Sequence, residues 1–325
     1  MKRFKNILFV AEAGQDNGPA LERAVTLAEN NQATLTVVDV VPRLAGETAF
    51  PSGGPTPDEL QEAMGQEDRR RLQALVEPFR ARTTIEVKVL QGTPFLEVIR
   101  EVLRSGHDLV VKAPEDPDWL DRLFGGDDMH LLRKCPCPVW MVKTGQPHPY
   151  RRILAAVDVD EVRPEAEARQ AMNLQILEIA GSLALAEFAE LYVAHAWEAI
   201  GEGTMRSAVV RVPEAQVTAY VEETHSQHRR ALDALLQAWR SRLGAEAVDY
   251  LGPQTHLIRG WPSREIPAIA KRLDVDLIVM GTVARTGVPG FFMGNTAETI
   301  LGQIGCSVLA VKPAGFTTPV TLEEG

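Results

Sequence analysis

Lys5-Asn-Ile-Leu-Phe-Val-Ala-Glu12 and Arg151-Arg-Ile-Leu-Ala-Ala-Val-Asp158 are two versions of one segment, 146 residues apart in the chain. Each is a short apolar run that ends at a carboxylate, which is typical of a strand buried on both faces. Further along, three more pairs of segments recur in the same order at spacings of 168 or 169 residues: Gln91-Gly-Thr-Pro94 with Arg259-Gly-Trp-Pro262, Asp108-Leu-Val-Val111 with Asp276-Leu-Ile-Val279, and Cys137-Pro-Val-Trp-Met-Val-Lys143 with Cys306-Ser-Val-Leu-Ala-Val-Lys312. The chain is therefore an internal repeat, with predicted domains over residues 1–146 and 147–325.

Each half alternates apolar or β-branched runs with segments of helical period. The expected strands cover residues 7–11, 34–41, 85–90, 109–111 and 139–142 in the first half, and 153–157, 190–196, 254–259, 277–280 and 307–311 in the second. Because strands that alternate with helices pair in parallel through right-handed crossovers, we predict an α/β fold of two tandem, doubly wound, five-stranded parallel sheets of the Rossmann type. Ligands bind such sheets at the carboxyl ends of the strands, where the strand order reverses.

Composition places the chain among ordinary globular proteins, because 45% of its 325 residues are hydrophobic and 24% are charged. The formal net charge of −10 argues against a nucleic-acid partner bound by a broad basic face. No uncharged apolar run reaches the roughly 18 residues of a membrane span, and the N-terminal residues lack the features of a signal peptide. Three cysteines are too few for a disulfide framework. We therefore expect a cytoplasmic protein without a membrane span.

A glycine-rich stretch follows the fourth expected strand of the second half. It runs from Gly281-Thr-Val-Ala-Arg-Thr-Gly287 to Gly294-Asn-Thr-Ala-Glu298. Glycines let a backbone approach an anion closely, and the free amides at the start of a helix favour negative charge. The stretch is a candidate phosphate cradle, and the alternative interpretation is a surface turn capped by Asn295 and Thr296.

The same stretch resembles the nucleotide motif of universal stress proteins, in which a Gly, two residues, a Gly and nine residues precede a Gly and a Ser or Thr. With Cys135-Pro-Cys-Pro-Val-Trp-Met-Val-Lys143, it makes the chain similar to the tandem, E-type members of that family. The resemblance covers nearly the whole chain and implies a fold like that of the adenine nucleotide alpha hydrolases. It also implies an internal pseudo-dimer through the last strand of each half, Val139–Val142 and Val308–Val311, with a homodimer of chains as a further option.

The family's nucleotide site can be carried over position by position. The resemblance implies that the segments after the first two strands hold the base and ribose, and that the glycine motif holds the phosphates. The corresponding residues in the second half are Val157, Asp158, Ala196, Met280, Gly281, Val283, Ala284, Gly294, Asn295, Thr296 and Ala297. Two of them depart from the family pattern: Ala284 replaces the second glycine of the motif, and Asn295 replaces the Ser or Thr.

The first half is a poorer candidate for the same site. Ala113 and Asp116 stand in place of the first two motif glycines, and the run Pro114-Glu-Asp-Pro-Asp118 puts three carboxylates where phosphates would bind. The pair Gly125-Gly126 remains, one residue early, and is followed by Asp127 and Asp128. Because like charges repel, we expect a degenerate structural domain.

These observations predict a stress-response protein whose second half binds an adenine nucleotide as a switch or occupancy signal. The ligands are ATP or AMP, with Mg²⁺ as an optional companion of the phosphates. We expect no catalytic residues and at most slow ATP hydrolysis, because no standard catalytic motif is present. The alternatives are an apolar or lipid-like ligand under the loop Val288–Met293, a scaffold without a ligand, and an enzyme that adenylates a substrate.

Three other groups of residues could carry chemistry. Cys135 and Cys137, with His130 nearby, allow a zinc hypothesis, but buried structural thiols are the commoner role in such a position. The run Asp68-Arg-Arg-Arg71 reads as the solvated face of a long helix. His225 and His228, three residues apart on another long helix, are expected at the surface or at an interface.

Overall fold

The computed structural model describes residues 4–44, 54–114, 126–160, 166–207, 209–282 and 293–322. The first half has one helix or helical turn in each crossover. Its elements are β1 (Asn6–Val10), α1 (Gly18–Asn31), β2 (Thr34–Val41), α2 (Pro57–Val76), the 3-10 turn η1 (Glu77–Phe79), β3 (Ile85–Gln91), α3 (Pro94–Ser105), β4 (Leu109–Lys112), α4 (Asp127–Lys134) and β5 (Val139–Met141).

The second half repeats this order, with extra helices in its second crossover, between β7 and β8. Its elements are β6 (Arg152–Ala156), α5 (Ala166–Glu187), β7 (Glu190–Trp197), α6 (Glu202–Met205), α7 (Glu214–Leu243), α8 (Ala245–Leu251), β8 (Gln254–Arg259), α9 (Pro262–Arg272), β9 (Leu277–Gly281), α10 (Asn295–Leu301) and β10 (Ser307–Val311). Every predicted strand is confirmed to within one residue at each end.

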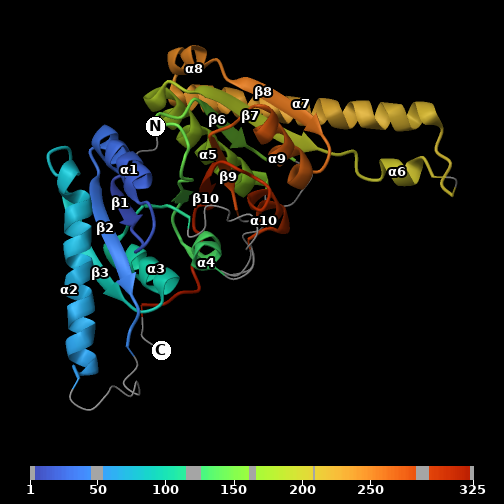
Figure 1. The fold of residues 1–325 in the computed structure, drawn as a ribbon. Helices are drawn as coiled ribbons and strands as arrows, with labels where there is room; N and C mark the ends of the chain where they lie inside the picture. Colours follow the sequence, from blue (N-terminus) through green and yellow to red (C-terminus); the bar gives the residue numbers. More distant parts are fainter. Residues whose placement is uncertain are drawn as a thin grey trace.

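All ten strands belong to one sheet, in the order β3-β2-β1-β4-β5-β10-β9-β6-β7-β8 (Figure 1). Within each half the neighbouring strands run parallel, and the order 3-2-1-4-5 is that of a doubly wound sheet. The predicted fold class, two tandem doubly wound α/β units, is confirmed.

The two halves join edge to edge through their last strands. β5 and β10 pair antiparallel, with Met141 opposite Val308 and Val139 opposite Ala310. Each last strand is buried, so that this edge of each half is covered by the other half, while β3 and β8 form the outer edges of the sheet. The pairing of the two predicted contact strands within one chain is confirmed, and nothing further follows about a dimer of two chains.

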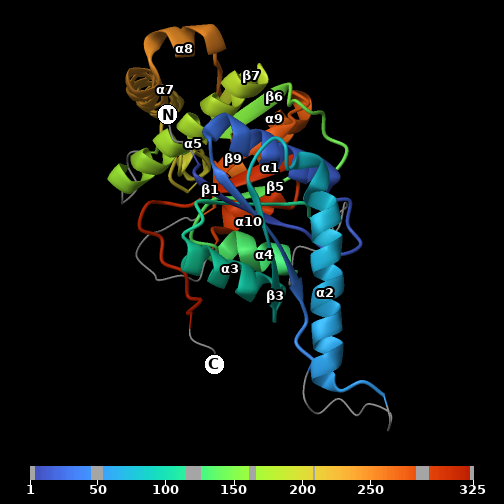
Figure 2. The same cartoon turned by 90° about the vertical axis from the view of Figure 1, so that its left-hand side faces the viewer.

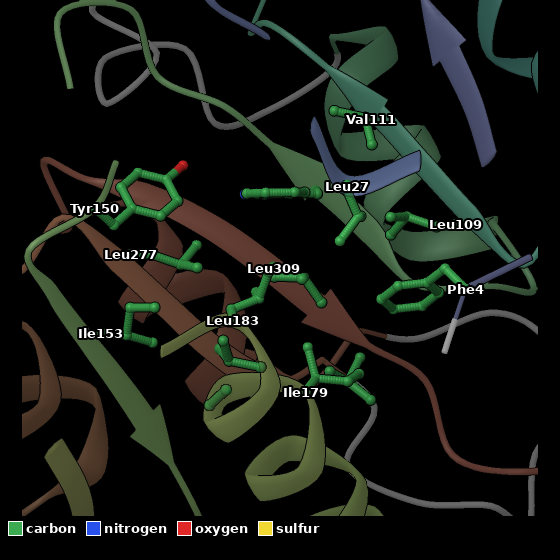
Figure 3. Close-up of a cluster of buried hydrophobic side chains, with 14 of the residues drawn as sticks. Phe4, Leu27, Leu109, Val111, Tyr150, Ile153, Ile179, Leu183, Leu277 and Leu309 are labelled. Atoms are coloured by element: carbon green, nitrogen blue, oxygen red, sulfur yellow. The ribbon is translucent and has the colours of Figure 1, made fainter. Parts of the chain in front are cut away.

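Helices cover both faces of the sheet. Buried residues of α1, α2, α5, α7 and α8 form one core layer, and those of α3, α4, α9 and α10 form the other. Successive strand residues alternate between the layers, as the pleat requires: Leu8 lies in the second layer and Phe9 in the first. Figure 3 shows that the first layer crosses the join, because Leu109 of the first half lies near Leu309 of the second.

The long helices α2 and α7 occupy corresponding places in the repeat. Each follows the second strand of its half, and each extends beyond the edge of the sheet (Figures 1 and 2). α2 begins in a capping box: the Glu59 amide donates to Thr56 Oγ1 at 3.2 Å, and the Thr56 amide donates to Glu59 Oε2 at 2.8 Å. In the part of the chain described, no helix is both long and apolar enough to cross a membrane.

Candidate functional site

The candidate ligand edge of the second half lies where the strand order reverses. From β6 the chain passes to β7 on one side, and later to β9 on the other side. Ala156, at the end of β6, pairs with Ala194 of β7 and with Met280 of β9. The ends of three strands therefore meet at one edge of the sheet, where doubly wound proteins bind their ligands.

The structure brings five of the predicted site residues to this edge. Val157 and Asp158 follow β6, Ala196 lies near the end of β7, and Met280 and Gly281 end β9. Val157, Ala196 and Met280 are buried, so that backbone atoms are the main groups they offer. The side chain of Asp158 is 48% exposed, which leaves its carboxylate accessible to a ligand hydroxyl.

Asp158 is held in place by two residues of α5 that sequence reasoning missed. The Asp158 amide donates to Asn173 Oδ1 at 3.0 Å, and Asn173 Nδ2 donates to the Asp158 carbonyl at 2.7 Å. Arg169 Nε lies 3.6 Å from Asp158 Oδ2. Asn173 is 3% exposed, and the other buried residues described in α5 are apolar. A polar residue at the helical period of an apolar face is the signal that could have found it.

His195 connects the segment after β6 to β7 and to α7. Its Nδ1 lies 3.1 Å from the Val157 carbonyl, and its Nε2 lies 3.0 Å from His228 Nδ1. The residue is 2% exposed. Burial lowers the pKa of His195, and the nearby Asp158 carboxylate opposes part of that effect. Of the two places expected for His228, a surface or an interface, the structure shows the second: the residue is partly buried between α7 and the sheet.

The end of β9 and the start of α10 lie side by side. The Gly294 amide donates to the Thr282 carbonyl at 3.0 Å, and the Thr282 amide donates to the Val311 carbonyl at 3.3 Å. Thr282 is 1% exposed, and its hydroxyl has no hydrogen-bond partner among the described residues. A Cβ atom at Gly281 would lie 2.8 Å from Met172 Cε, the end of a flexible side chain that would have to move aside.

The predicted residues of α10 occupy its first turn. Gly294 is the N-cap residue with φ of −65°, a conformation open to any residue, so that its glycine is not required by backbone geometry. The side chains of Asn295 and Thr296 are exposed, and Ala297 is buried. The first amides of a helix have no partner within it, which leaves the amides of this turn directed toward the same edge.

Some of the expectations lie outside the described residues. Val283 and Ala284 are among them, and so is the loop from Val288 to Phe292 that the apolar-ligand alternative requires. Of that loop only Met293 is described, and it is buried in the core layer that contains α9 and α10.

The corresponding edge of the first half is occupied by an ion cluster. Lys112, at the end of β4, is 2% exposed, and its ammonium group contacts the carboxylates of Glu12 and Asp128. Burial disfavours the charge of Lys112, but Asp128 and Glu12 outweigh it and raise its pKa. In the repeat, Lys112 corresponds to Met280, Glu12 to Asp158 and Asp128 to Thr296. The first half thus fills this place with its own side chains, and among the described residues of the second half no ion cluster corresponds to it.

The backbone support of the first strand is nevertheless the same in both halves. The Glu12 amide donates to Asn17 Oδ1 at 3.2 Å, and Asn17 Nδ2 donates to the Glu12 carbonyl at 2.8 Å, as Asn173 does for Asp158. One detail of the sequence comparison was wrong: Gly126 is not one residue early. It is the N-cap residue of α4, as Gly294 is of α10.

The first half also contacts the candidate site across the join. Lys312, which follows β10, is 3% exposed, and its ammonium donates to the Leu132 carbonyl at 2.5 Å and to the Arg133 carbonyl at 3.3 Å. Burial lowers the pKa of Lys312 to about 8. The Arg133 side chain lies 2.9 Å from Glu298 in α10. The C-terminus of α4 therefore packs beside the start of α10.

The remaining candidate groups have structural contacts. Cys135, Cys137 and Cys306 are buried free thiols, and the Sγ atoms of Cys135 and Cys137 lie 3.6 Å apart. His130 stacks on Phe95. Among the described residues no three histidine, cysteine or acidic side chains form a cluster able to hold a metal ion. Zinc therefore finds no support in this part of the chain.

Comparison with known proteins agrees with the repeat. The profile described as Universal stress protein family matches residues 3–143 and again 149–312. The chain is 33% identical to Universal stress protein E of Escherichia coli (strain K12), over 100% of this chain and 99% of the relative. It is 31% identical to the Universal stress protein E homolog of Haemophilus influenzae, over 96% of this chain and 98% of the relative.

Solved structures share the whole architecture. A functionally unknown protein from Pseudomonas aeruginosa PAO1 is 27% identical and superposes with a TM-score of 0.66, covering 95% of this chain and 93% of that one. A universal stress protein from Archaeoglobus fulgidus shares the fold at 16% identity, with a TM-score of 0.62, over 96% of this chain and 98% of that one. With two family matches that together span most of its length, the chain belongs to the Universal stress protein family.

Proposed function

We propose that the second half binds an adenine nucleotide, ATP or AMP, at the edge formed by the ends of β6, β7 and β9 and the start of α10. The base and ribose occupy the side of Val157, Asp158 and Ala196, and the phosphates occupy the side of Gly281 and Gly294. Binding serves as a switch or occupancy signal. For ATP, Mg²⁺ accompanies the phosphates as an optional partner.

The observation that carries this proposal is the contrast between the two edges. In the first half Lys112 supplies a cation that neutralises two carboxylates, so the polar groups of that edge are already paired. In the second half Met280 supplies no charge, and the Asp158 carboxylate stays about half exposed. Arg169, 3.6 Å away, pairs with this carboxylate without burying it. A partly exposed carboxylate at the switch point of a doubly wound sheet is the default place for a ligand.

Two further features fit a nucleotide. A ribose hydroxyl can donate to the carboxylate of Asp158, which Asn173 holds through its backbone. At the other end the buried Thr282 hydroxyl and the amides of the first turn of α10 can bind phosphate oxygens. The two ends lie on neighbouring strands, β6 and β9, so that a single ligand can reach both.

The site supports binding better than catalysis. Among the described residues near its phosphate end, Glu298 carries a carboxylate, and this carboxylate is paired with Arg133. A general base must be free to accept the proton of the attacking water, and a carboxylate paired with an arginine is a poor acceptor. We therefore propose at most slow hydrolysis of ATP, which phosphate release from a stoichiometric complex would measure.

Calorimetric titration of the purified chain with ATP and with AMP tests the proposal. The Gly294→Trp variant places a large side chain at the start of α10 and should weaken binding more than about tenfold, which corresponds to about 1.4 kcal/mol. The matched control is Gly126→Trp, at the N-cap of α4 in the first half, which should leave the affinity unchanged. Equal affinity in wild type and Gly294→Trp would overturn the proposed site, and absence of binding by the wild type would overturn the proposed function.

A further inference from the structure

Each half joins its second strand to its long helix by one polar contact, and the chemistry of that contact differs. In the first half Asp39 of β2 is 6% exposed and forms an ion pair with Arg71 of α2. In the second half the corresponding residues are both histidines. His195 of β7 corresponds to Asp39, and His228 of α7 corresponds to Arg71. Arg71 is therefore partly buried against the sheet, which corrects the expectation of a fully solvated face.

The hydrogen-bond partners of the two histidines determine which ring nitrogens carry protons. The Val157 carbonyl can only accept a hydrogen bond, so Nδ1 of His195 carries a proton and donates it. The neutral ring then has a lone pair on Nε2, which accepts the Nδ1 proton of His228 at 3.0 Å. When both rings are protonated, two N–H groups face each other across this distance and the contact is lost. The contact between Asp39 and Arg71 is not lost by protonation of its basic partner, because Arg71 always carries its charge.

The histidine pair lies against the proposed base and ribose end of the site. His195 precedes Ala196 in β7 and bonds the carbonyl of Val157, the residue before Asp158. The charged groups that face it are Asp158 and Asp160 on the segment after β6. Trp197 packs against the ring of His228 at 5.8 Å and against that of His225 at 5.3 Å, so α7 closes this side of the cluster.

We infer that His195 is a positioning residue of the proposed nucleotide site, and that its bond to His228 makes nucleotide binding sensitive to pH. With the pair neutral, His195 holds the segment of Val157 and Asp158 at a fixed distance from Ala196, the spacing that a base and ribose require. With both rings protonated, the contact between His195 Nε2 and His228 Nδ1 is lost, while the Nδ1 bond to Val157 remains. The His195 ring then loses its support from α7, and the segment of Val157 and Asp158 is held less firmly. This inference rests on the proposed function and adds to it a residue that contacts no ligand and a form of regulation.

The experiment compares ATP affinity by calorimetry between pH 5.5 and 7.5 in three chains. Because burial lowers the pKa of His195, the loss of affinity is expected at the acid end of this range. There wild type should bind up to about tenfold more weakly, the loss expected when binding lowers the pKa of one group by one unit. His195→Asn keeps a nitrogen donor close to the position of Nδ1 but does not titrate, and His228→Asn keeps a donor toward His195 Nε2. Both variants should bind ATP at pH 7.5 and lose most of the difference between the two pH values. The titration of the ATP phosphates is common to all three chains and cancels in the comparison.

The possible outcomes separate the two proposals. If ATP binds but wild type and His195→Asn have the same pH profile, His195 is structural only and the inference is overturned. If His195→Asn does not fold, the His228→Asn profile decides in the same way. If wild type binds no ATP at either pH, the proposed function itself fails and the inference fails with it. A flat profile in both variants beside a steep one in wild type supports the inference.

Discussion

In the first half of the chain the ammonium group of Lys112 lies between the carboxylates of Glu12 and Asp128, and in the second half the corresponding residues are Met280, Asp158 and Thr296. The strands around these positions have the same order, and the backbone of the first strand is held by an asparagine in both halves. The repeat has therefore kept its scaffold while the side chains at its ligand edge have diverged.

Within one fold, the edge of the first half is occupied by its own ion cluster, and the corresponding edge of the second half is the proposed ligand site. The buried ammonium group of Lys112 is neutralised by two carboxylates. Its charge is therefore not available to the phosphates of an anionic ligand. At the edge with Met280 the carboxylate of Asp158 has Arg169 3.6 Å away but stays about half exposed, so a ligand can still reach it. The comparison predicts that changes at Lys112 act on stability, and that changes around Asp158 act on both stability and binding.

The largest expected effect comes from removing the cation at the edge of the first half. Lys112→Met leaves Glu12 and Asp128 without their shared partner, and breaking a buried pair in this way costs about 3–5 kcal/mol of unfolding free energy. Guanidinium unfolding followed by circular dichroism measures it. The triple variant with Glu12→Gln and Asp128→Thr removes the unpaired charges as well and should recover most of the loss. A single variant as stable as wild type would show that the cluster does not neutralise itself as described.

A smaller effect is expected from the two asparagines that support the first strands. Asn173→Leu removes two hydrogen bonds to backbone groups, and Asn17→Leu removes three, two with Glu12 and one with the Gln15 carbonyl. Each variant should cost about 2 kcal/mol of stability. Only Asn173→Leu should also weaken ATP binding, because only its half holds the proposed ligand. Unfolding and calorimetry on the same samples separate the two effects. Equal ATP affinity in both variants would remove the functional distinction between the halves.

The smallest expected effect concerns the join and depends on pH. Burial lowers the pKa of Lys312 to about 8 in the folded chain, below the usual value of about 10.4. Between these values the unfolded chain binds a proton that the folded chain does not, so the contribution of Lys312 to stability rises with pH, by at most about 1.4 kcal/mol per pH unit. Urea unfolding at pH 8 and pH 9 should show this rise, about 1 kcal/mol, in wild type and less of it in Lys312→Met. Lys143→Met, at the corresponding position after β5, is the control and should keep the wild-type slope.

Much of the fold could be predicted from local patterns. Apolar runs such as Ile7–Val10 and Leu277–Met280 are strands in the structure, and the recurrence of Cys137–Lys143 at Cys306–Lys312 indicated which strands are equivalent. The pairing of β5 with β10 followed from the family resemblance and is confirmed. The candidate site residues converge on one edge because the carboxyl ends of parallel strands lie together.

The supporting polar contacts could not be predicted in the same way. Asn173 with Asp158, His228 with His195 and Arg71 with Asp39 each join residues from separate elements, 15 to 33 positions apart in the chain. Hydrophobic period assigns a residue to a helix and to one face of it, but it does not say which polar group of another element that face meets. Arg71 therefore looked like a surface residue, and His228 like one at a surface or an interface.

By itself, the sequence determined the repeat, the α/β architecture and the edge where a ligand is expected, because these depend on local period and on general rules of chain connection. Only the tertiary structure decided that Lys112 occupies that edge in the first half and that His195 and His228 meet in the second. The physical reason is that a buried polar group must find a partner, and which partner lies within reach depends on how whole elements pack against one another.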